Sequence, residues 1–121
     1  MEFLKRLSEA TSQLDAGWRN ELGFPSLPVL SHGSLLVKVY APRGTDHQSP
    51  HTRDEVYVVA RGRGEFVCGE LRTTFNETDL LFVPAGQTHR FENFSDELTL
   101  WVIFYGAEGG EKPDSGPHNY S

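Results

Sequence analysis

Cysteine is nearly absent from this sequence, and its scarcity limits how the chain can be stabilised. Cys68 is the single cysteine among 121 residues. One thiol cannot form an intramolecular disulfide, and a chain without disulfides suits a reducing compartment. We therefore expect a cytoplasmic protein. Its length is typical of one domain with a modest hydrophobic core.

Positive charge is also in short supply. Eleven lysines and arginines stand against seventeen aspartates and glutamates, which gives a formal net charge of −6. A general nucleic-acid binder needs a basic face that displaces counterions from the phosphate backbone. We therefore expect no nucleic-acid partner.

Long apolar runs are missing as well. The longest, Leu100–Tyr105, is far shorter than the roughly 20 residues that a helix needs to span a bilayer. Near the N-terminus, Lys5, Arg6, Glu9 and Asp15 interrupt any apolar stretch of the kind found in secretory signals. We therefore expect no membrane partner.

The N-terminal part of the chain has the periodicity of one amphipathic helix. Between residues 2 and 15, side chains suited to a buried face recur at steps of three and four, and Gly17 is a suitable stop. Residues 1–18 are thus predicted to be an N-terminal helix. Residues 19–34 are rich in proline and glycine, which predicts a linker loop with at most a short strand at Val29–Leu30.

Residues 35–105 alternate between short β-prone runs and turns, which is typical of an all-β sandwich or barrel. The predicted strands are residues 35–40, 56–60, 65–68, 71–75, 80–83, 89–92 and 98–105. Residues 106–121 are rich in glycine and charge, which predicts a loose tail in which His118 is a solvated histidine.

Two segments of this β region carry metal-ligand side chains. His51 and Glu55 lie in the first segment, and His89 lies in the second. Because side chains alternate faces along a strand, all three can point into one cavity if the segments run side by side. Two imidazoles and a carboxylate would leave open coordination positions on a transition metal.

A plainer interpretation of Glu55 is an ion pair. The residue precedes the apolar run Val56–Ala60, where an unpaired charge would be costly. An arginine could neutralise it as well as a metal could. The candidate arginines are Arg61, Arg63 and Arg90.

These two segments resemble the two motifs of the cupin superfamily, in the form of a small single-domain cupin of the conserved-barrel type. The first family motif contains a histidine, three or four residues, a glutamate, six residues and a glycine, which match His51, Glu55 and Gly62. The second motif matches at Pro84, Gly86, His89 and Asn93. The resemblance covers roughly residues 35–105.

The resemblance implies a double-stranded β-helix, which is the jelly-roll barrel of cupins, following a short N-terminal helix. It also implies a homodimer and one divalent transition metal, either iron, manganese, nickel, copper or zinc. His51, Glu55 and His89 would be the metal ligands. Cupin chemistries include dioxygenase, isomerase and lyase reactions on small molecules.

The sequence departs from the cupin pattern at one ligand position. The leading histidine of the first motif should stand at position 49, but that residue is Ser49, whose side chain is too short to replace an imidazole. His47 and Gln48 are candidate fourth ligands, and a three-ligand site completed by water is the third option. A second departure, Thr78 in place of a glycine, falls at a turn.

Three further residues are candidates for a substrate pocket. Arg53 shares the parity of Glu55 and is suited to meet an anionic substrate. Tyr57 follows Glu55 on the same face, and Phe91 follows His89 on its face, where it could form an apolar wall. No residue is assigned as catalytic.

Three functions are compatible with these features. The first is a mononuclear metalloenzyme, which would lose activity on chelation. The second is a non-catalytic domain that binds or senses a small ligand, although such cupins are usually fused to a DNA-binding domain and no helix-turn-helix is predicted here. The third is a metal-free enzyme, similar to some sugar-nucleotide epimerases, in which histidines act as general acid and base.

Overall fold

The computed structural model describes residues 3–112, so the predicted tail histidine His118 lies outside the described residues. Within that range the chain forms one helix and eight strands. They are α1 (Leu7–Asp15), β1 (Ser26–His32), β2 (Leu35–Tyr40), β3 (Asp54–Arg61), β4 (Gly64–Cys68), β5 (Leu71–Phe75), β6 (Leu80–Val83), β7 (His89–Glu92) and β8 (Thr99–Tyr105).

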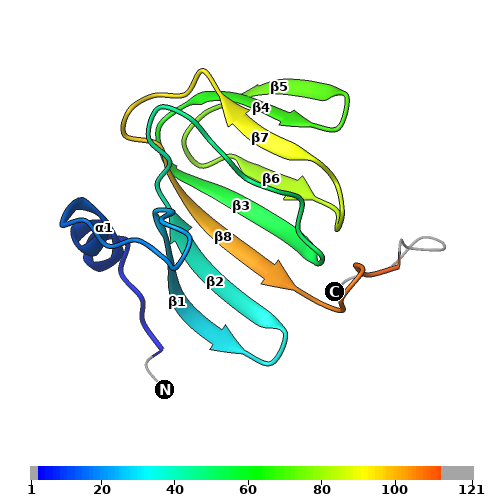
Figure 1. Cartoon of the computed structure of the whole chain (residues 1–121), viewed down its shortest axis with the longest axis horizontal. Coiled ribbons are helices and arrows are strands. Elements are labelled where there is room, and N and C mark those ends of the chain that lie inside the picture. Colours follow the sequence, from blue (N-terminus) through cyan, green and yellow to red (C-terminus); the bar gives the residue numbers. More distant parts are fainter. Residues whose placement is uncertain (1–2, 113–121) are drawn as a thin grey trace.

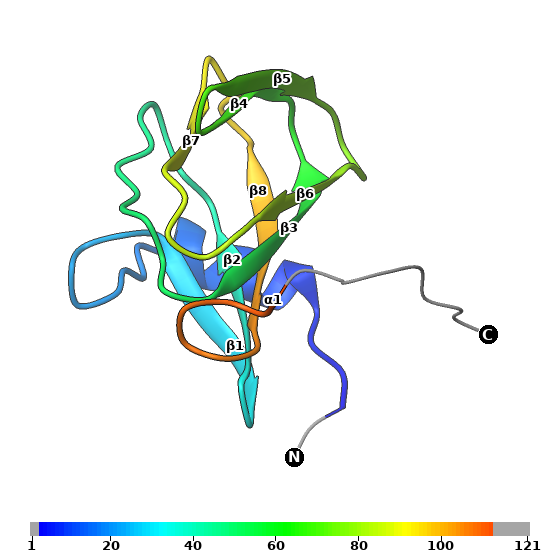
Figure 2. The same cartoon turned by 90° about the vertical axis from the view of Figure 1, so that its right-hand side faces the viewer.

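The strands form two antiparallel sheets that together make a jelly-roll barrel (Figure 1). The larger sheet has the order β1-β2-β8-β3-β6, and the smaller has the order β5-β4-β7. In Figure 2 strands β3 to β8 surround a common interior, which is filled by a cluster of buried apolar side chains. The all-β fold predicted from the alternating strands and turns is therefore confirmed.

The N-terminal region differs from the prediction in two places. The helix begins at Leu7 rather than at residue 2, because Arg6 already has an extended backbone. The predicted linker contains the seven-residue strand β1, which pairs with β2. The sequence predicted at most a short strand at Val29–Leu30, inside β1. Pro28 hid its full length, because an edge strand tolerates a proline next to the bulge between Pro28 and Leu30.

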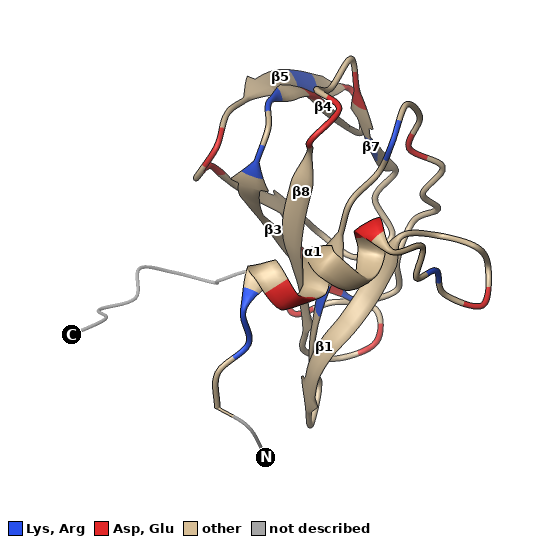
Figure 3. Ribbon diagram, turned by 90° about the vertical axis from the view of Figure 1, so that its left-hand side faces the viewer, with Lys and Arg blue, Asp and Glu red and all other residues tan. Residues whose placement is uncertain are grey.

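The helix α1 packs on the outside of the barrel (Figure 3). Its buried residues Ala10 and Leu14 form a second apolar cluster with Leu27 of β1 and Val39 of β2.

Within residues 3–112, no helix is both long enough and apolar enough to span a membrane. The domain boundaries proposed from the sequence remain a prediction.

The fold brings the two motif segments together. Glu55 is on the central part of the larger sheet, where it pairs with Phe104 of β8 and Val83 of β6. His89 begins β7 and pairs with Cys68 of β4. The Gly86 amide donates a hydrogen bond to the His51 carbonyl at 2.7 Å, so the backbone itself joins the two segments.

A glycine at the turn after β3 allows a close approach between two chain segments. Gly62 has a φ of +96°, and a Cβ atom there would lie 2.9 Å from Leu98 Cα and 2.7 Å from Ser95 Oγ. We predict that Gly62→Ala lowers the free energy of unfolding by about 2–4 kcal/mol, because backbone strain and overpacking act together. The measurement is chemical denaturation.

The matched control is Gly33→Ala, in the turn between β1 and β2. Gly33 also has a positive φ, +59°, but no atom lies within 4 Å of its added Cβ. The control should cost only about 1 kcal/mol, which is the strain of a left-handed backbone. Equal losses in the two variants would show that the close approach at Leu98 contributes nothing.

Candidate metal centre

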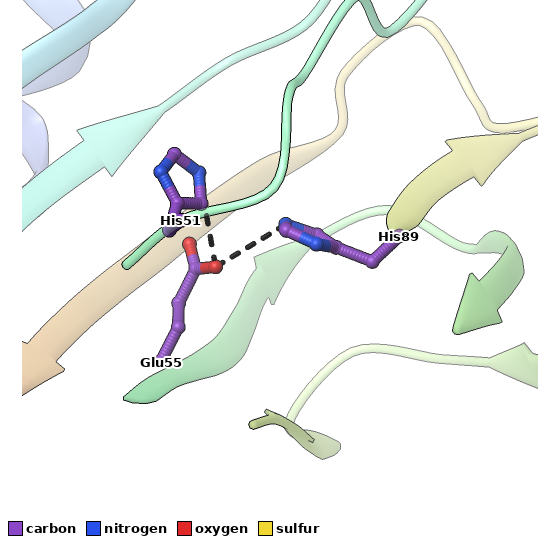
Figure 4. Close-up of side chains that lie close together, drawn as sticks. All are labelled: His51, Glu55 and His89. Atoms are coloured by element: carbon purple, nitrogen blue, oxygen red, sulfur yellow. Dashed lines mark ion pairs between the residues drawn. The ribbon is translucent and has the colours of Figure 1, made fainter. Parts of the chain in front are cut away.

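Three side chains predicted as metal ligands meet inside the barrel (Figure 4). The Glu55 Oε1 atom lies 3.2 Å from His89 Nε2 and 3.9 Å from His51 Nε2. One ligand atom from each residue lies within 4.8 Å of those of the other two. Donors at this spacing are close enough to share one ion.

The three groups differ in their exposure to solvent. The side chains of Glu55 and His89 are 1% and 0% exposed, whereas the side chain of His51 is 37% exposed. The site is therefore closed on the side of β3 and β7 and open at His51. An ion held here would be anchored from the barrel interior and approached from the loop that precedes β3.

Glu55 carries the clearest sign of a missing partner. Both of its carboxylate oxygens are buried without a hydrogen bond to any described residue. Its contacts with the two imidazoles are ion-pair contacts, at 3.2 Å to His89 Nε2 and 3.9 Å to His51 Nε2. Because a buried carboxylate without a cationic partner is costly, these orphaned oxygens fit a bound cation.

The arginine alternative for Glu55 is not realised in the structure. Among the described residues, the ion-pair contacts of Glu55 are with His51 and His89. Arg90 instead pairs with Glu92 on the outer face of β7. Arg61 and Arg63 are exposed to solvent.

The orientation of His89 is fixed by its backbone contact. Its Nδ1 atom lies 2.9 Å from the Gln87 carbonyl oxygen. Because a carbonyl only accepts, Nδ1 carries a proton, and the second ring nitrogen, Nε2, faces Glu55. Nε2 is therefore the atom that His89 would offer to a metal.

The two histidines have opposite pKa shifts. Burial lowers the pKa of His89, but the adjacent Glu55 carboxylate and the Gln87 carbonyl outweigh it, so the pKa is raised above the ordinary value. For His51, burial is the largest effect and the pKa is lowered despite the charge of Glu55. The negative potential of Glu55 is thus felt most strongly at the His89 imidazole.

A chain of hydrogen bonds ends beside the Nε2 atom of His89. Tyr57 donates its hydroxyl proton to Gln48 Oε1 at 2.7 Å, and Gln48 Nε2 donates to Asp46 Oδ2 at 2.8 Å. Asp46 also accepts from the Tyr40 hydroxyl and the Phe91 amide. The Tyr57 oxygen lies 3.1 Å from His89 Nε2. Burial, followed by the charge of Glu55, raises the pKa of Tyr57, so its hydroxyl stays protonated.

The candidate fourth ligands lie outside the cluster. The amide of Gln48 is engaged by Asp46 and Tyr57, which explains why its oxygen is not directed at Glu55. His47 is exposed and lines the adjacent cavity, and Ser49 is exposed beside it. The described residues thus bring together three candidate ligand side chains, those of His51, Glu55 and His89. Whether water or His47 completes the coordination stays a prediction.

A cavity of about 220 Å³ opens beside the cluster and is lined by both His51 and Glu55. The rest of its wall combines apolar, polar and charged side chains. The apolar ones are Leu22, Phe24, Val102 and Phe104, the polar ones are Asn20, Ser26, Tyr40, His47, Gln48 and Ser49, and the charged one is Lys38. Sequence reasoning did not single out Lys38. It could have been found from its position, because Lys38 lies two residues from both Leu36 and Tyr40 in a predicted strand and therefore shares their face.

The three residues proposed for the substrate pocket are placed elsewhere. Tyr57 and Phe91 are 0% and 2% exposed and belong to the apolar core. Arg53 donates a hydrogen bond to the Ser34 carbonyl and lies over the Phe104 ring. None of the three lines the cavity beside His51. The alternation of side chains along a strand predicts which face of the sheet a residue is on, but it does not predict how far the residue lies from the open end of the barrel. Their role towards a substrate stays a prediction.

We predict that Tyr57→Phe lowers the free energy of unfolding by about 1 kcal/mol, because the half-buried Gln48 Oε1 would lose the hydrogen bond that Tyr57 donates. Tyr105→Phe is the matched control, since Tyr105 is half-buried and no side-chain hydrogen bond ties it to a described residue. The control should change stability by about 0.5 kcal/mol or less. Equal stability of the two variants in urea would contradict a supporting role for Tyr57.

Comparison with known proteins agrees with this fold and motif arrangement. The cupin domain family matches residues 36–105. An uncharacterised protein of Streptomyces coelicolor is 40% identical over 80 residues, covering 64% of this chain and 76% of that protein.

Two solved structures share the fold. A cupin-2 domain protein from Shewanella frigidimarina has a TM-score of 0.67 at 14% identity, covering 85% of this chain and 95% of its own. Iron(II) HppE in complex with substrate has a TM-score of 0.57 at 15% identity, covering 66% of this chain and 52% of its own. With the family match over most of the barrel, the chain belongs to the cupin family.

Proposed function

We propose that this cupin holds one divalent transition metal with His51, Glu55 and His89 and that it acts on a small molecule in the adjacent cavity. The observation that carries the proposal is the Glu55 carboxylate, buried with both oxygens unpartnered and faced by two imidazole nitrogens. Two histidines and a carboxylate suit iron, manganese, nickel, copper or zinc.

A bound metal would supply Lewis acidity or, if it is redox-active, electron transfer. The protein contributes the rest of the site. Glu55 and His89 form its buried wall, and the half-exposed His51 borders the cavity. This asymmetry supports a site with its free positions on the cavity side, where a small molecule would enter.

Within this proposal the protein is a small metalloenzyme of the dioxygenase, isomerase or lyase type. The fold of iron(II) HppE in complex with substrate supports the idea that a barrel of this shape can hold a metal and a small molecule together. The second candidate is a non-catalytic cupin that binds a small ligand. Turnover of the ligand separates the two.

The third candidate is a metal-free cupin that uses its histidines as general acid and base, similar to sugar-type epimerases. The contact of His89 with Glu55 at 3.2 Å supports it, because a carboxylate can stabilise an imidazolium. Activity that survives exhaustive chelation would favour this candidate over the metalloenzyme.

The exposed side chains of Leu80 and Phe82, 64% and 50% accessible, lie on β6, which is an edge of the larger sheet. An apolar edge strand of this kind supports the proposed homodimer. The N-terminal helix α1 and the strand β1 are the other candidate dimer elements.

A cytoplasmic location remains an expectation from the scarcity of cysteine.

We expect the protein, purified without a metal-affinity tag, to contain about one equivalent of one transition metal, measured by inductively coupled plasma mass spectrometry. The double variant His51→Ala/His89→Ala should lose it. His32→Ala is the matched control, since His32 is an exposed imidazole at the end of β1, and it should retain the metal. A parent that stays metal-free after reconstitution would overturn the metal site.

The same protein gives a second measurement. Metal at about 100 times its dissociation constant should raise the free energy of unfolding of the parent by ~2.7 kcal/mol, with no stabilisation of the double variant. His47→Ala should respond as the parent does if three side chains complete the protein ligands. A lost response in His47→Ala would instead identify His47 as the fourth ligand.

A further inference from the structure

From the cavity we infer that the small molecule is a monoanionic organic acid, whose carboxylate pairs with Lys38 while its apolar body lies against Phe104 and Val102. This inference rests on the proposed small-molecule site and names the chemical class of its ligand. The argument starts from the position of Lys38 in β2.

Lys38 is an inward-facing cation in the middle of a strand. Its neighbours at two-residue spacing, Leu36 and Tyr40, pack in the barrel core, whereas Val39 packs in the cluster beneath α1. Because side chains alternate along a strand, Lys38 faces the barrel side of the sheet. It is half-buried, and its side chain lines the cavity.

The Lys38 ammonium has no acidic partner among residues 3–112. Its recorded contact is with the Phe104 ring, whose centroid lies 5.7 Å from Nζ. A cation–π contact of this kind contributes only about 0.5–1 kcal/mol. Lysine facing the inside of a barrel without a carboxylate is unfavourable on stability grounds alone, so a binding role accounts for it better than a packing role does.

The buried carboxylates nearby are already committed. Asp46 accepts hydrogen bonds from Tyr40, Gln48 and the Phe91 amide, and Glu55 is grouped with His51 and His89. Neither makes an ion pair with Lys38 in the structure. The charge of Lys38 is therefore available to a ligand rather than to the protein.

Phe104 connects Lys38 with the candidate metal centre. The His51 ring packs edge-on against the Phe104 ring at a centroid distance of 4.9 Å, and Lys38 Nζ lies over the same ring. A ligand whose carboxylate meets Lys38 and whose apolar body lies along Phe104 would reach the exposed edge of His51. Binding and the metal would then act on one small molecule.

The size and lining of the cavity limit the ligand class. A volume of about 220 Å³ is below the range of about 300–1,000 Å³ that is usual for drug-sized ligands. Lys38 is the one lysine or arginine in the lining of the cavity, which suits a ligand with a single negative charge such as a carboxylate. The lining also carries polar side chains, but the wall formed by Leu22, Phe24, Val102 and Phe104 offers a surface for a hydrocarbon or aromatic body.

Arg53 is the instructive contrast to Lys38. Its guanidinium also lies over Phe104, at 6.0 Å from the ring centroid to Cζ. However, Arg53 donates a hydrogen bond to the Ser34 carbonyl and does not line the cavity. Arg53→Met therefore removes a positive charge near the same ring without removing the proposed anchor, which makes it a matched control.

The experiment is isothermal titration calorimetry of the purified protein with a series of monocarboxylates, from acetate to 3-phenylpropanoate, each beside its neutral amide. The metal content of every sample is measured in parallel. We expect at least one carboxylate to bind the parent about tenfold or more tightly than its amide. Lys38→Met should abolish that preference, whereas Lys38→Arg and Arg53→Met should keep it.

Two results would overturn the inference: no carboxylate preferred over its amide by the parent, or a preference that survives in Lys38→Met. Thermal unfolding adds a check on folding, since Lys38→Met should be at least as stable as the parent after losing a half-buried charge. A marked loss of stability would instead assign Lys38 a structural role. If the parent proves metal-free but keeps the carboxylate preference, only the metal proposal fails.

Discussion

The rest of the structure depends on one buried carboxylate. Glu55 is 1% exposed and sits on β3 between its neighbours β8 and β6, so its charge cannot be solvated by water. The barrel meets this cost with two imidazoles, one from the loop four residues upstream and one from β7 on the opposite sheet. The two imidazoles do not fully offset the cost of burying this charge, because both carboxylate oxygens still lack hydrogen bonds to the described residues.

Support for this centre comes from a polar network that extends away from it. Asp46 accepts three hydrogen bonds, one of them from Gln48. Gln48 in turn accepts a hydrogen bond from Tyr57, whose hydroxyl oxygen contacts His89. The network occupies the region where the cupin pattern would have its leading histidine, a position held here by Ser49. In a hydrogen-bond chain of this kind, a fully satisfied set of polar groups can hold one geometry.

Charged groups serve different purposes on the two sides of the barrel. On the outer face of the smaller sheet, Arg72 pairs with Glu65 and Glu92 at 3.0 and 2.8 Å, and exposed pairs of this kind contribute little to stability. On the inner side, Lys38 lines the cavity beside His51 without an acidic partner among the described residues. The contrast marks the cavity, rather than the outer surface, as the part of the molecule suited to recognition.

The sequence by itself determined the β class, the succession of strands along residues 35–105 and the identity of the three candidate ligands, because alternation and motif spacing are local properties of the chain. The meeting of the three side chains depended on the pairing of strands in the barrel. The sequence did not determine the full length of strand β1, since Pro28 signals a loop unless the strand is known to lie at an edge. Nor could it decide that Gln48 bridges Asp46 and Tyr57, or that Lys38 rather than Arg53 borders the cavity. Those outcomes depend on which strands pair and how deep each side chain lies, and only the closed barrel fixes both.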